Sequence, residues 1–190
     1  MSHQHHGRKV VESRSVFKGQ IFEALVERVA LPDGKEVERE VVRHPGAVGV
    51  IPIDADGNIL FVRQHRHAVE DDLLEIPAGK LAENEDPWLC ARRELEEETG
   101  FKCGSLELLI SYWSTPGFSN ERVHIFTATE LEKVADAPVL DGDEAIASEW
   151  LSEDEATGAI FDGRIKDGKT IIGVALLKLQ EHPEDLGVEI

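Results

Sequence analysis

A run of carboxylates inside one strong helix signal is the feature that most constrains this chain of 190 residues. The helix is expected over residues 86–99. Asp86 suits the N-cap, Pro87 suits the first helical position, and Gly100 suits the stop after the last turn. A fold for this chain must therefore place an amphipathic, acidic helix against a core.

Three glutamates of this helix share one edge. At about 100° per residue, Glu94, Glu97 and Glu98 lie within about 100° of one another, whereas Glu96 points elsewhere into solvent. The neighbouring stripe, expected to face the core, consists of Trp88, Ala91 and Leu95. Clustered carboxylates raise one another's pKa, and divalent cations relieve that repulsion. Hard oxygen ligands favour Mg²⁺, with Mn²⁺ as a substitute. A solvated acidic face is the alternative interpretation.

The segment from Gly79 to Phe101 resembles the Nudix box. Every fixed position of that pattern is filled here, by Gly79, Glu85, Arg93, Glu94, Leu95, Glu97, Glu98, Gly100 and Phe101. The resemblance implies metal-assisted hydrolysis of a pyrophosphate bond in a nucleoside diphosphate derivative. It assigns catalysis and metal binding to Glu94, Glu97 and Glu98, with the carbonyl of Ala78 as a further metal ligand. Arg93 would hold a carboxylate in orientation, and Glu85 would brace the loop.

Three segments outside the box resemble the ADP-ribose pyrophosphatase subfamily. Residues 111–121 resemble its S-x-PG-x-S-x-E segment, residues 62–66 its V-x-Q-x-R segment, and residues 74–79 its L-E-x-P-A-G entry to the box. The likeness extends over residues 15–180. It implies Mg²⁺-dependent hydrolysis of ADP-ribose to AMP and ribose 5-phosphate.

The same resemblance assigns residues to the substrate. Arg66 would contact the diphosphate or the terminal ribose, and Arg39 and Arg43 would do similar work, including across a dimer interface; a surface salt bridge is the alternative for each. Phe118 would pack on the substrate or close the core, and Glu121 would orient the substrate or a metal-bound water. The assigned set is completed by Glu75, Pro116 and Gly117.

The general base is expected on the acidic loop at 141–144. The resemblance places the base on a loop that closes over the diphosphate, and Glu144 is the candidate; plain loop acidity is the alternative. His65 departs from the subfamily, which often has an aromatic or apolar residue there. The shape of the terminal-sugar pocket is therefore left open.

Hydrophobic alternation predicts a β-rich chain with three helices. A β-hairpin is expected from residues 15–30 and 36–42 around a Pro-Asp-Gly turn. Further strands are expected at 47–53, 59–63, 73–77, 106–113, 122–129 and 146–151, and further helices at 152–160 and 169–181. This order predicts an α/β (α+β) Nudix fold, with a mixed β-sheet sandwiched between α-helices.

We expect three regions. Residues 1–14, which are polar and begin with a histidine-rich stretch, would form a disordered tail. Residues 15–45 would form the N-terminal β-hairpin region, and residues 46–190 the Nudix hydrolase domain. Because a two-stranded hairpin is marginal alone, it is expected to pack on a second copy as a dimerisation arm, which predicts a homodimer.

Bulk properties restrict the partners. The formal net charge of −18 argues against a nucleic-acid backbone, which needs clustered Lys and Arg. No stretch approaches the roughly 20 apolar residues of a membrane span, and no signal segment is apparent. Two cysteines make no disulfide framework, so a cytoplasmic location is expected. The alternatives to ADP-ribose are another nucleoside diphosphate sugar (an ADP-, GDP- or UDP-hexose) and a non-catalytic nucleotide-sensing Nudix domain.

Overall fold

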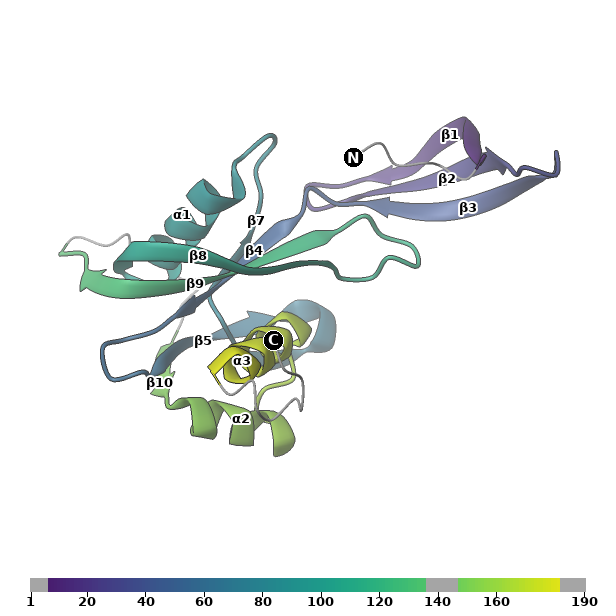
Figure 1. Ribbon diagram of the computed structural model, residues 1–190. Helices are drawn as coiled ribbons and strands as arrows, with labels where there is room; N and C mark the ends of the chain where they lie inside the picture. The colour runs from purple at the N-terminus through teal and green to yellow at the C-terminus, as the bar shows by residue number, and fades with distance from the viewer. Residues whose placement is uncertain (1–6, 136–146, 182–190) are drawn as a thin grey trace. The chain divides into compact units, whose positions relative to one another are not determined.

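The computed structural model describes residues 7–135 and 147–181 (Figure 1). The chain separates into two compact units. The first runs to Gly46 and includes Trp113–Arg122, and the second contains Ala47–Tyr112 and the chain from Val123 onward. Residues 113–122, which were expected inside the second region, therefore belong to the first unit.

The first unit contains a three-stranded antiparallel sheet in the order β1-β2-β3. Its strands are β1 (Lys9–Lys18), β2 (Glu23–Ala30) and β3 (Glu36–Arg43). The expected β2–β3 hairpin is present, with Glu23 opposite Arg43. The single strand expected over 15–30 is broken by a turn in which the Gly19 N–H donates to the Phe22 carbonyl over 3.0 Å.

The expected disordered tail is corrected for residues 9–14, which belong to β1. This strand has no clear alternation in its sequence and all its side chains are exposed. Its order comes from backbone pairing with β2, from Lys9 opposite Ala30 to Lys18 opposite Glu23. Residues 1–6 lie outside the described residues.

The second unit contains two sheets. One has the order β7-β4-β9-β8 and is mixed, because β4 pairs parallel with β9 and antiparallel with β7; the other has the antiparallel order β10-β5-β6. The strands are β4 (Ala47–Pro52), β5 (Ile59–Arg66), β6 (Asp71–Glu75), β7 (Ala78–Lys80), β8 (Phe101–Trp113), β9 (Arg122–Lys133) and β10 (Ala147–Leu151).

Helices cover both faces of the mixed sheet in Figure 1. They are α1 (Pro87–Thr99), α2 (Glu153–Phe161) and α3 (Gly168–Glu181), with a short 3₁₀ turn, η1, at His67–Val69. Val48 and Val50 of β4 belong to a buried cluster with Leu95 of α1. Ile51 belongs to a second cluster with Val174 of α3. The alternating side chains of one strand therefore bind helices on opposite faces, which confirms the predicted sandwich.

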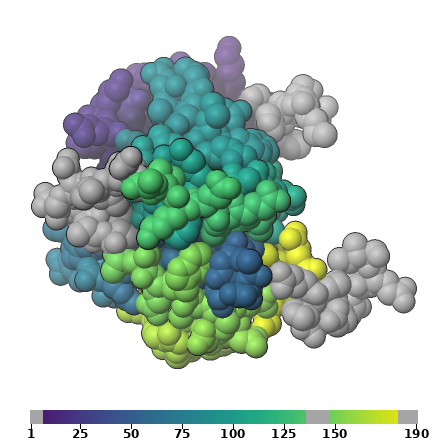
Figure 2. Space-filling view, turned by 90° about the vertical axis from the view of Figure 1, so that its left-hand side faces the viewer, coloured from purple at the N-terminus to yellow at the C-terminus, as the bar shows by residue number. Residues whose placement is uncertain are grey.

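The turn between β4 and β5 lies close to β10. Figure 2 shows the turn between β4 and β5 (dark blue) beside the green surface of β10 and α2, in agreement with the pairing of β10 with β5. Within residues 7–135 and 147–181, no helix is long and apolar enough to cross a membrane.

Candidate active site

Helix α1 begins and ends where its sequence predicts. The Asp86 carboxylate accepts from the backbone N–H of Trp88 at 2.8 Å and of Leu89 at 3.4 Å, and Pro87 occupies the first position. Gly100 has a φ of 71° and donates to the carbonyl of Glu96 over 2.9 Å. Because this left-handed conformation favours glycine, the helix stops there and β8 begins at the next residue.

The buried face of α1 differs from the expected stripe at one position. Ala91 and Leu95 are fully buried, but Trp88 is 42% exposed and packs edge-on against Phe126 at 5.1 Å. Cys90 is fully buried in its place. Trp88 lies in the first helical turn and is covered on one side only, by Phe126 of β9.

Glu94 lies against the backbone of β7. A Cβ atom added to Gly79 would overlap the Glu94 carboxylate, so any other residue at this position would displace that carboxylate. Val48 of β4 pairs with Gly79 and holds the short strand in place. Glu94 is only 9% exposed, and its burial raises the pKa of its carboxyl group.

Glu98 reaches the same short strand one turn further on. Its Oε2 accepts a hydrogen bond of 3.0 Å from the Ala78 N–H. Burial raises the pKa of Glu98 to about 7, and the nearby charge of Glu94 adds to the increase, although the Ala78 hydrogen bond opposes it. Glu94, Glu98 and the Ala78–Gly79 backbone are therefore gathered at one place.

Arg93 holds the other carboxylates of the segment. Its Nη1 donates to Glu94 over 2.7 Å and to Glu97 over 3.0 Å, while Nε and Nη2 each donate to Glu85 over 3.1 Å. These bonds keep the pKa of Glu85 at about 2. Glu85 also accepts from the Ala82 N–H at 2.8 Å, which braces the loop before α1. Both residues thus make the structural contacts that the resemblance implies.

Glu96 turns away from this group, as its helical position predicts. It forms an ion pair with Lys102, whose Nζ lies 3.4 Å from its carboxylate; the Lys102 side chain is exposed and that of Glu96 is half-buried. An exposed pair of this kind contributes little to stability.

The donor set fits a hard divalent cation. In the described part of the chain, no three acidic, histidine or cysteine side chains are yet grouped closely enough to hold a metal ion. Arg93 donates hydrogen bonds to Glu94 and Glu97, and the Ala78 N–H donates to Glu98. All the donors are oxygens. Burial is the main cause of the raised pKa values of Glu94 and Glu98, and a bound cation would stabilise their charged forms.

Arg66 is fixed on a buried carboxylate. Its Nε and Nη2 donate to the two oxygens of Glu75 over 2.8 and 2.7 Å, and Glu75 is 1% exposed. Lys169 of α3 donates to the same carboxylate. The charges of Arg66 and Lys169 both act to lower the pKa of Glu98, which places these three residues in one electrostatic environment. Glu75, which was expected to contact substrate, offers almost no exposed surface.

Sequence reasoning missed Lys169. One signal was available in the sequence. A lysine in the first turn of a helix is repelled by the positive end of the helix dipole, so Lys169 was at an unfavourable position in the expected helix. Such a lysine requires carboxylate partners, and the structure supplies Glu75 and Asp167. Lys169 lies far from Glu75 of β6 in the sequence, so the sequence alone did not indicate that the two form an ion pair.

Two expected substrate arginines lie on β3 in the first unit. Arg43 Nη2 donates to Glu27 over 2.8 Å, and Glu27 is buried. Arg39 is exposed and donates to the neighbouring carbonyl of Glu38 over 2.8 Å. Arg43 is thus oriented by a buried carboxylate, in the manner of Arg66, whereas Arg39 is not.

The 111–121 segment meets β3 within the same unit. The Val42 N–H donates to the Phe118 carbonyl over 2.8 Å, and Phe118 itself is exposed. His44 Nδ1 lies 3.4 Å from a carboxylate oxygen of Glu121. Pro116 and Gly117 lie in the turn of this segment. The structure therefore brings Arg43, Phe118 and Glu121 onto one unit.

The two remaining predicted positions are His65 and Glu144. His65 is exposed and its Nδ1 lies 2.8 Å from Asp72. Glu144 and the rest of the 141–144 loop lie outside the described residues.

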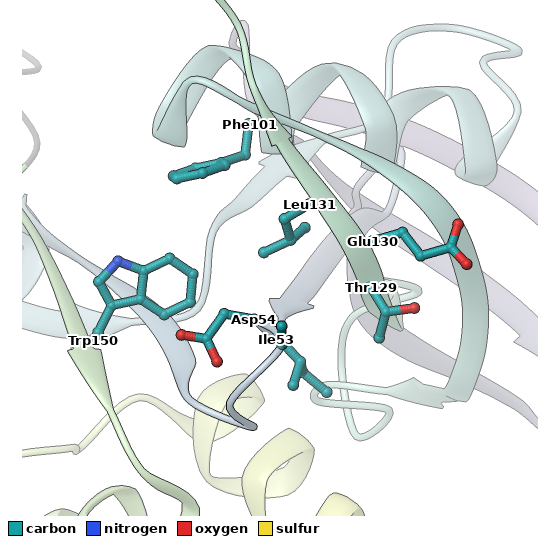
Figure 3. Close-up of a pocket in the computed structure, with 8 residues that line it drawn as sticks. Ile53, Asp54, Phe101, Thr129, Glu130, Leu131 and Trp150 are labelled. Atoms are coloured by element: carbon teal, nitrogen blue, oxygen red, sulfur yellow. The ribbon is translucent and has the colours of Figure 1, made fainter.

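A cavity of about 380 Å³ occupies another part of the second unit (Figure 3). Phe101 and Trp150 form one wall with ring centroids 5.9 Å apart, while the carboxylate of Glu130 points away from the space. The full lining is Ile53, Asp54, Ala55, Phe101, Thr129, Glu130, Leu131 and Trp150. None of the expected metal or substrate residues belongs to it.

Comparison with known proteins agrees with this geometry. The model of the NUDIX domain matches residues 43–172. A methanol dehydrogenase activator from Bacillus methanolicus is 45% identical over 91% of this chain and 94% of its own length. An ADP-ribose pyrophosphatase from Bacillus subtilis (strain 168) is 38% identical over the same shares. A solved structure described as an ADP compounds hydrolase superposes with a TM-score of 0.79 at 18% identity, covering 93% of this chain and 96% of that one.

The chain belongs to the Nudix family. Its mixed sheet between helices and its carboxylate-bearing helix α1 are those of a Nudix hydrolase.

Proposed function

We propose that this protein hydrolyses the pyrophosphate bond of ADP-ribose, giving AMP and ribose 5-phosphate, with Mg²⁺ as its cofactor and Mn²⁺ as a substitute. The observation that carries the proposal is the meeting of Glu94 and Glu98 at the Ala78–Gly79 backbone. The likeness to an ADP-ribose pyrophosphatase over nearly the whole chain supports the choice of substrate.

The metal would be held by the carboxylates of Glu94, Glu97 and Glu98 and by the carbonyl of Ala78. When bound, a divalent cation neutralises diphosphate oxygens and lowers the pKa of a coordinated water. Arg93 keeps the carboxylates oriented through its hydrogen bonds. Glu144 is proposed as the general base that accepts the proton of the attacking water.

The substrate would be bound chiefly by arginines, because an acidic protein needs local cations to hold an anion. Arg66 is proposed to contact the diphosphate, held in place by Glu75. Arg39 and Arg43 are proposed to contact the substrate as well. Phe118 and Glu121 are two further proposed substrate contacts. The turn that presents them includes Pro116 and Gly117.

We further propose a cytoplasmic homodimer that associates through the 15–45 region. All side chains of β1 are exposed, and apolar ones are prominent among them and in the turn after it. Phe17 is 53% exposed and lies 5.5 Å from the ring of Phe22. An exposed apolar surface on a thin sheet is suited to cover by a second copy. Residues 46–190 would then act as the catalytic domain.

A substrate panel tests the activity. The specificity constant kcat/KM is measured for ADP-ribose, ADP-glucose, GDP-mannose, UDP-glucose and NADH, with and without Mg²⁺. ADP-ribose is expected to rank first, and turnover is expected to need the metal. A sugar nucleotide ranking more than tenfold above ADP-ribose would overturn the substrate. No turnover of any diphosphate would favour a nucleotide sensor.

A second candidate function is activation of an alcohol dehydrogenase. It is favoured by the 45% identity to a methanol dehydrogenase activator, which exceeds the 38% identity to the Bacillus subtilis pyrophosphatase. The test adds the protein, with Mg²⁺, to a purified methanol dehydrogenase and measures the rate of alcohol oxidation. An increase that is lost with Glu98→Gln would support the candidate, and an unchanged rate would exclude it for that partner.

A further inference from the structure

We propose that Lys169 is a positioning residue for substrate binding: together with Glu75, it presets the guanidinium of Arg66 for the diphosphate. This inference rests on the proposed pyrophosphatase function and extends it to a residue on α3.

The carboxylate of Glu75 occupies one edge of Arg66. Nε and Nη2 of Arg66 donate to the two Glu75 oxygens, so the planar fork of the guanidinium is locked. Its Nη1 makes no hydrogen bond to any residue in 7–135 or 147–181. The side chain is 38% exposed. Arg66 is therefore held on a buried anion by one edge, and one nitrogen is left available for a second anion.

Lys169 is itself held firmly. Its side chain is 14% exposed, its Nζ donates to Glu75, and it lies 3.1 Å from an oxygen of Asp167. The first turn of α3 is fastened to the end of β6 a second time, since the Ile76 N–H donates to Thr170 Oγ1 over 3.0 Å. Thr170 Oγ1 in turn donates to Asp167 over 2.6 Å. This lysine is thus a fixed part of the Glu75 environment.

The charges of this group explain why two cations are needed. Arg66 and Lys169 carry two positive charges, which balance the two negative charges of Glu75 and Asp167. A buried carboxylate needs full compensation by charge and hydrogen bonding. Without Lys169, Arg66 alone must satisfy Glu75, and its guanidinium is no longer held in the same orientation. Substrate binding is then weakened because Arg66 is misplaced for the diphosphate.

The test compares Lys169→Met and Lys169→Arg with Lys178→Met in the full-length protein. Lys178 is a matched control, because it lies on the same helix and pairs with Glu153 at 3.3 Å and Asp154 at 2.9 Å. With Mg²⁺ and ADP-ribose, Lys169→Met is expected to raise KM by on the order of 10- to 100-fold, with a smaller change in kcat. Lys169→Arg should recover most of the loss, and Lys178→Met should match the wild type.

A double-mutant cycle separates positioning from a general structural role. If Lys169 acts through Arg66, Lys169→Met should weaken binding no further in an Arg66→Ala background. Additive losses in that background, or an unchanged KM in Lys169→Met, would overturn the inference. If Lys169→Met does not fold, the pair Glu75→Gln with Lys169→Met removes the buried charge together with its partner. That variant should fold and still show the raised KM, and a wild-type KM would contradict the proposal.

A binding measurement keeps this inference distinct from the proposed function. If the wild type hydrolyses no diphosphate, the proposed function fails while the positioning role is still measurable. Calorimetric titration with inorganic pyrophosphate and Mg²⁺ should then show weaker binding to Lys169→Met than to the wild type and to Lys178→Met. Equal binding to all three would overturn the role of Lys169.

Discussion

The two units of this chain are stabilised in different ways. The unit that begins at Ala47 buries two clusters of hydrophobic side chains, with the carboxylate helix α1 packed against one of them. In the sheet of β1, β2 and β3, only Leu25 and Glu27 are buried. The unit that begins at Ala47 can hold charged groups in place by its own packing. The sheet of β1, β2 and β3 depends on backbone pairing and, we propose, on contact with a second copy of the chain. Changes in the second unit, which carries the catalytic residues, should therefore affect kcat and metal binding. Changes in the sheet of the first unit should affect KM and association.

The largest expected effect is from Glu98→Gln in the catalytic unit. Removing one carboxylate charge from the metal donor set should lower kcat by at least on the order of 100-fold, with the fold intact. Steady-state kinetics at saturating Mg²⁺ measures the loss. Glu96→Gln, on the surface of the same helix, is the control and should keep the wild-type rate. A wild-type kcat in Glu98→Gln would remove this residue from the metal site.

Gly79→Ala should come next. Its new methyl group would overlap the Glu94 carboxylate, and a displacement of about 1 Å in a catalytic group can cost about 100-fold in rate. Activity is compared with Gly158→Ala, since nothing lies near the Cβ position at Gly158. If Gly79→Ala retained full activity, Glu94 would not need its observed position.

Phe17→Asp should act on the sheet without changing the chemistry. A charge on its exposed apolar surface should convert the proposed dimer to a monomer, as measured by sedimentation. The kcat/KM for ADP-ribose should fall by about tenfold, which is the loss expected when one charge-assisted contact to the substrate is removed. Phe161→Asp is a matched control, because Phe161 is 87% exposed on α2 of the other unit. A wild-type protein that sediments as a monomer would contradict the dimer.

The smallest effect concerns pH and stability in the catalytic unit. Because burial raises the pKa of Glu98 from 4.5 to about 7, the folded protein holds a proton between these values that the unfolded chain releases. Stability without metal should therefore fall as pH rises through this window. Glu98→Gln should be more stable than the wild type at pH 8 by on the order of 1–3 kcal/mol, with little difference at pH 4.

Urea unfolding in the absence of metal measures that difference. Added Mg²⁺ should stabilise the wild type at pH 8 and have little effect on Glu98→Gln, since ligands that bind only the folded state stabilise it. Equal stability of the two metal-free proteins at pH 8 would show that the buried carboxylate is compensated in another way.

Local signals in the sequence predicted α1 well. The cap at Asp86 and the stop at Gly100 depend on residues within one helical turn of each end. The same sequence did not reveal β7, which is only three residues long, or the beginning of β1 at Lys9. These strands owe their order to pairing with β4 and β2 and not to an alternating pattern of their own.

The site was predicted to the extent that its residues are close in sequence. Glu94, Glu98 and Gly79 lie within one motif, and the structure brings them together. Lys169 is 94 residues from Glu75, and no pattern in a single sequence connects the two. Trp88 was misplaced for a related reason, because helical periodicity gives the face of a residue but not how far the neighbouring sheet extends over it.

The four-way contact of Arg93 has a consequence for how this helix can vary over evolutionary time. One guanidinium orients Glu85, Glu94 and Glu97, so the loss of Arg93 would release all three carboxylates at once. A lysine there has a single ammonium group and cannot reproduce the planar fork. A lineage that loses Arg93 would therefore disturb three acidic positions in one mutational step. Catalytic decay in such a descendant should be abrupt, and its acidic residues would be free to drift only afterwards.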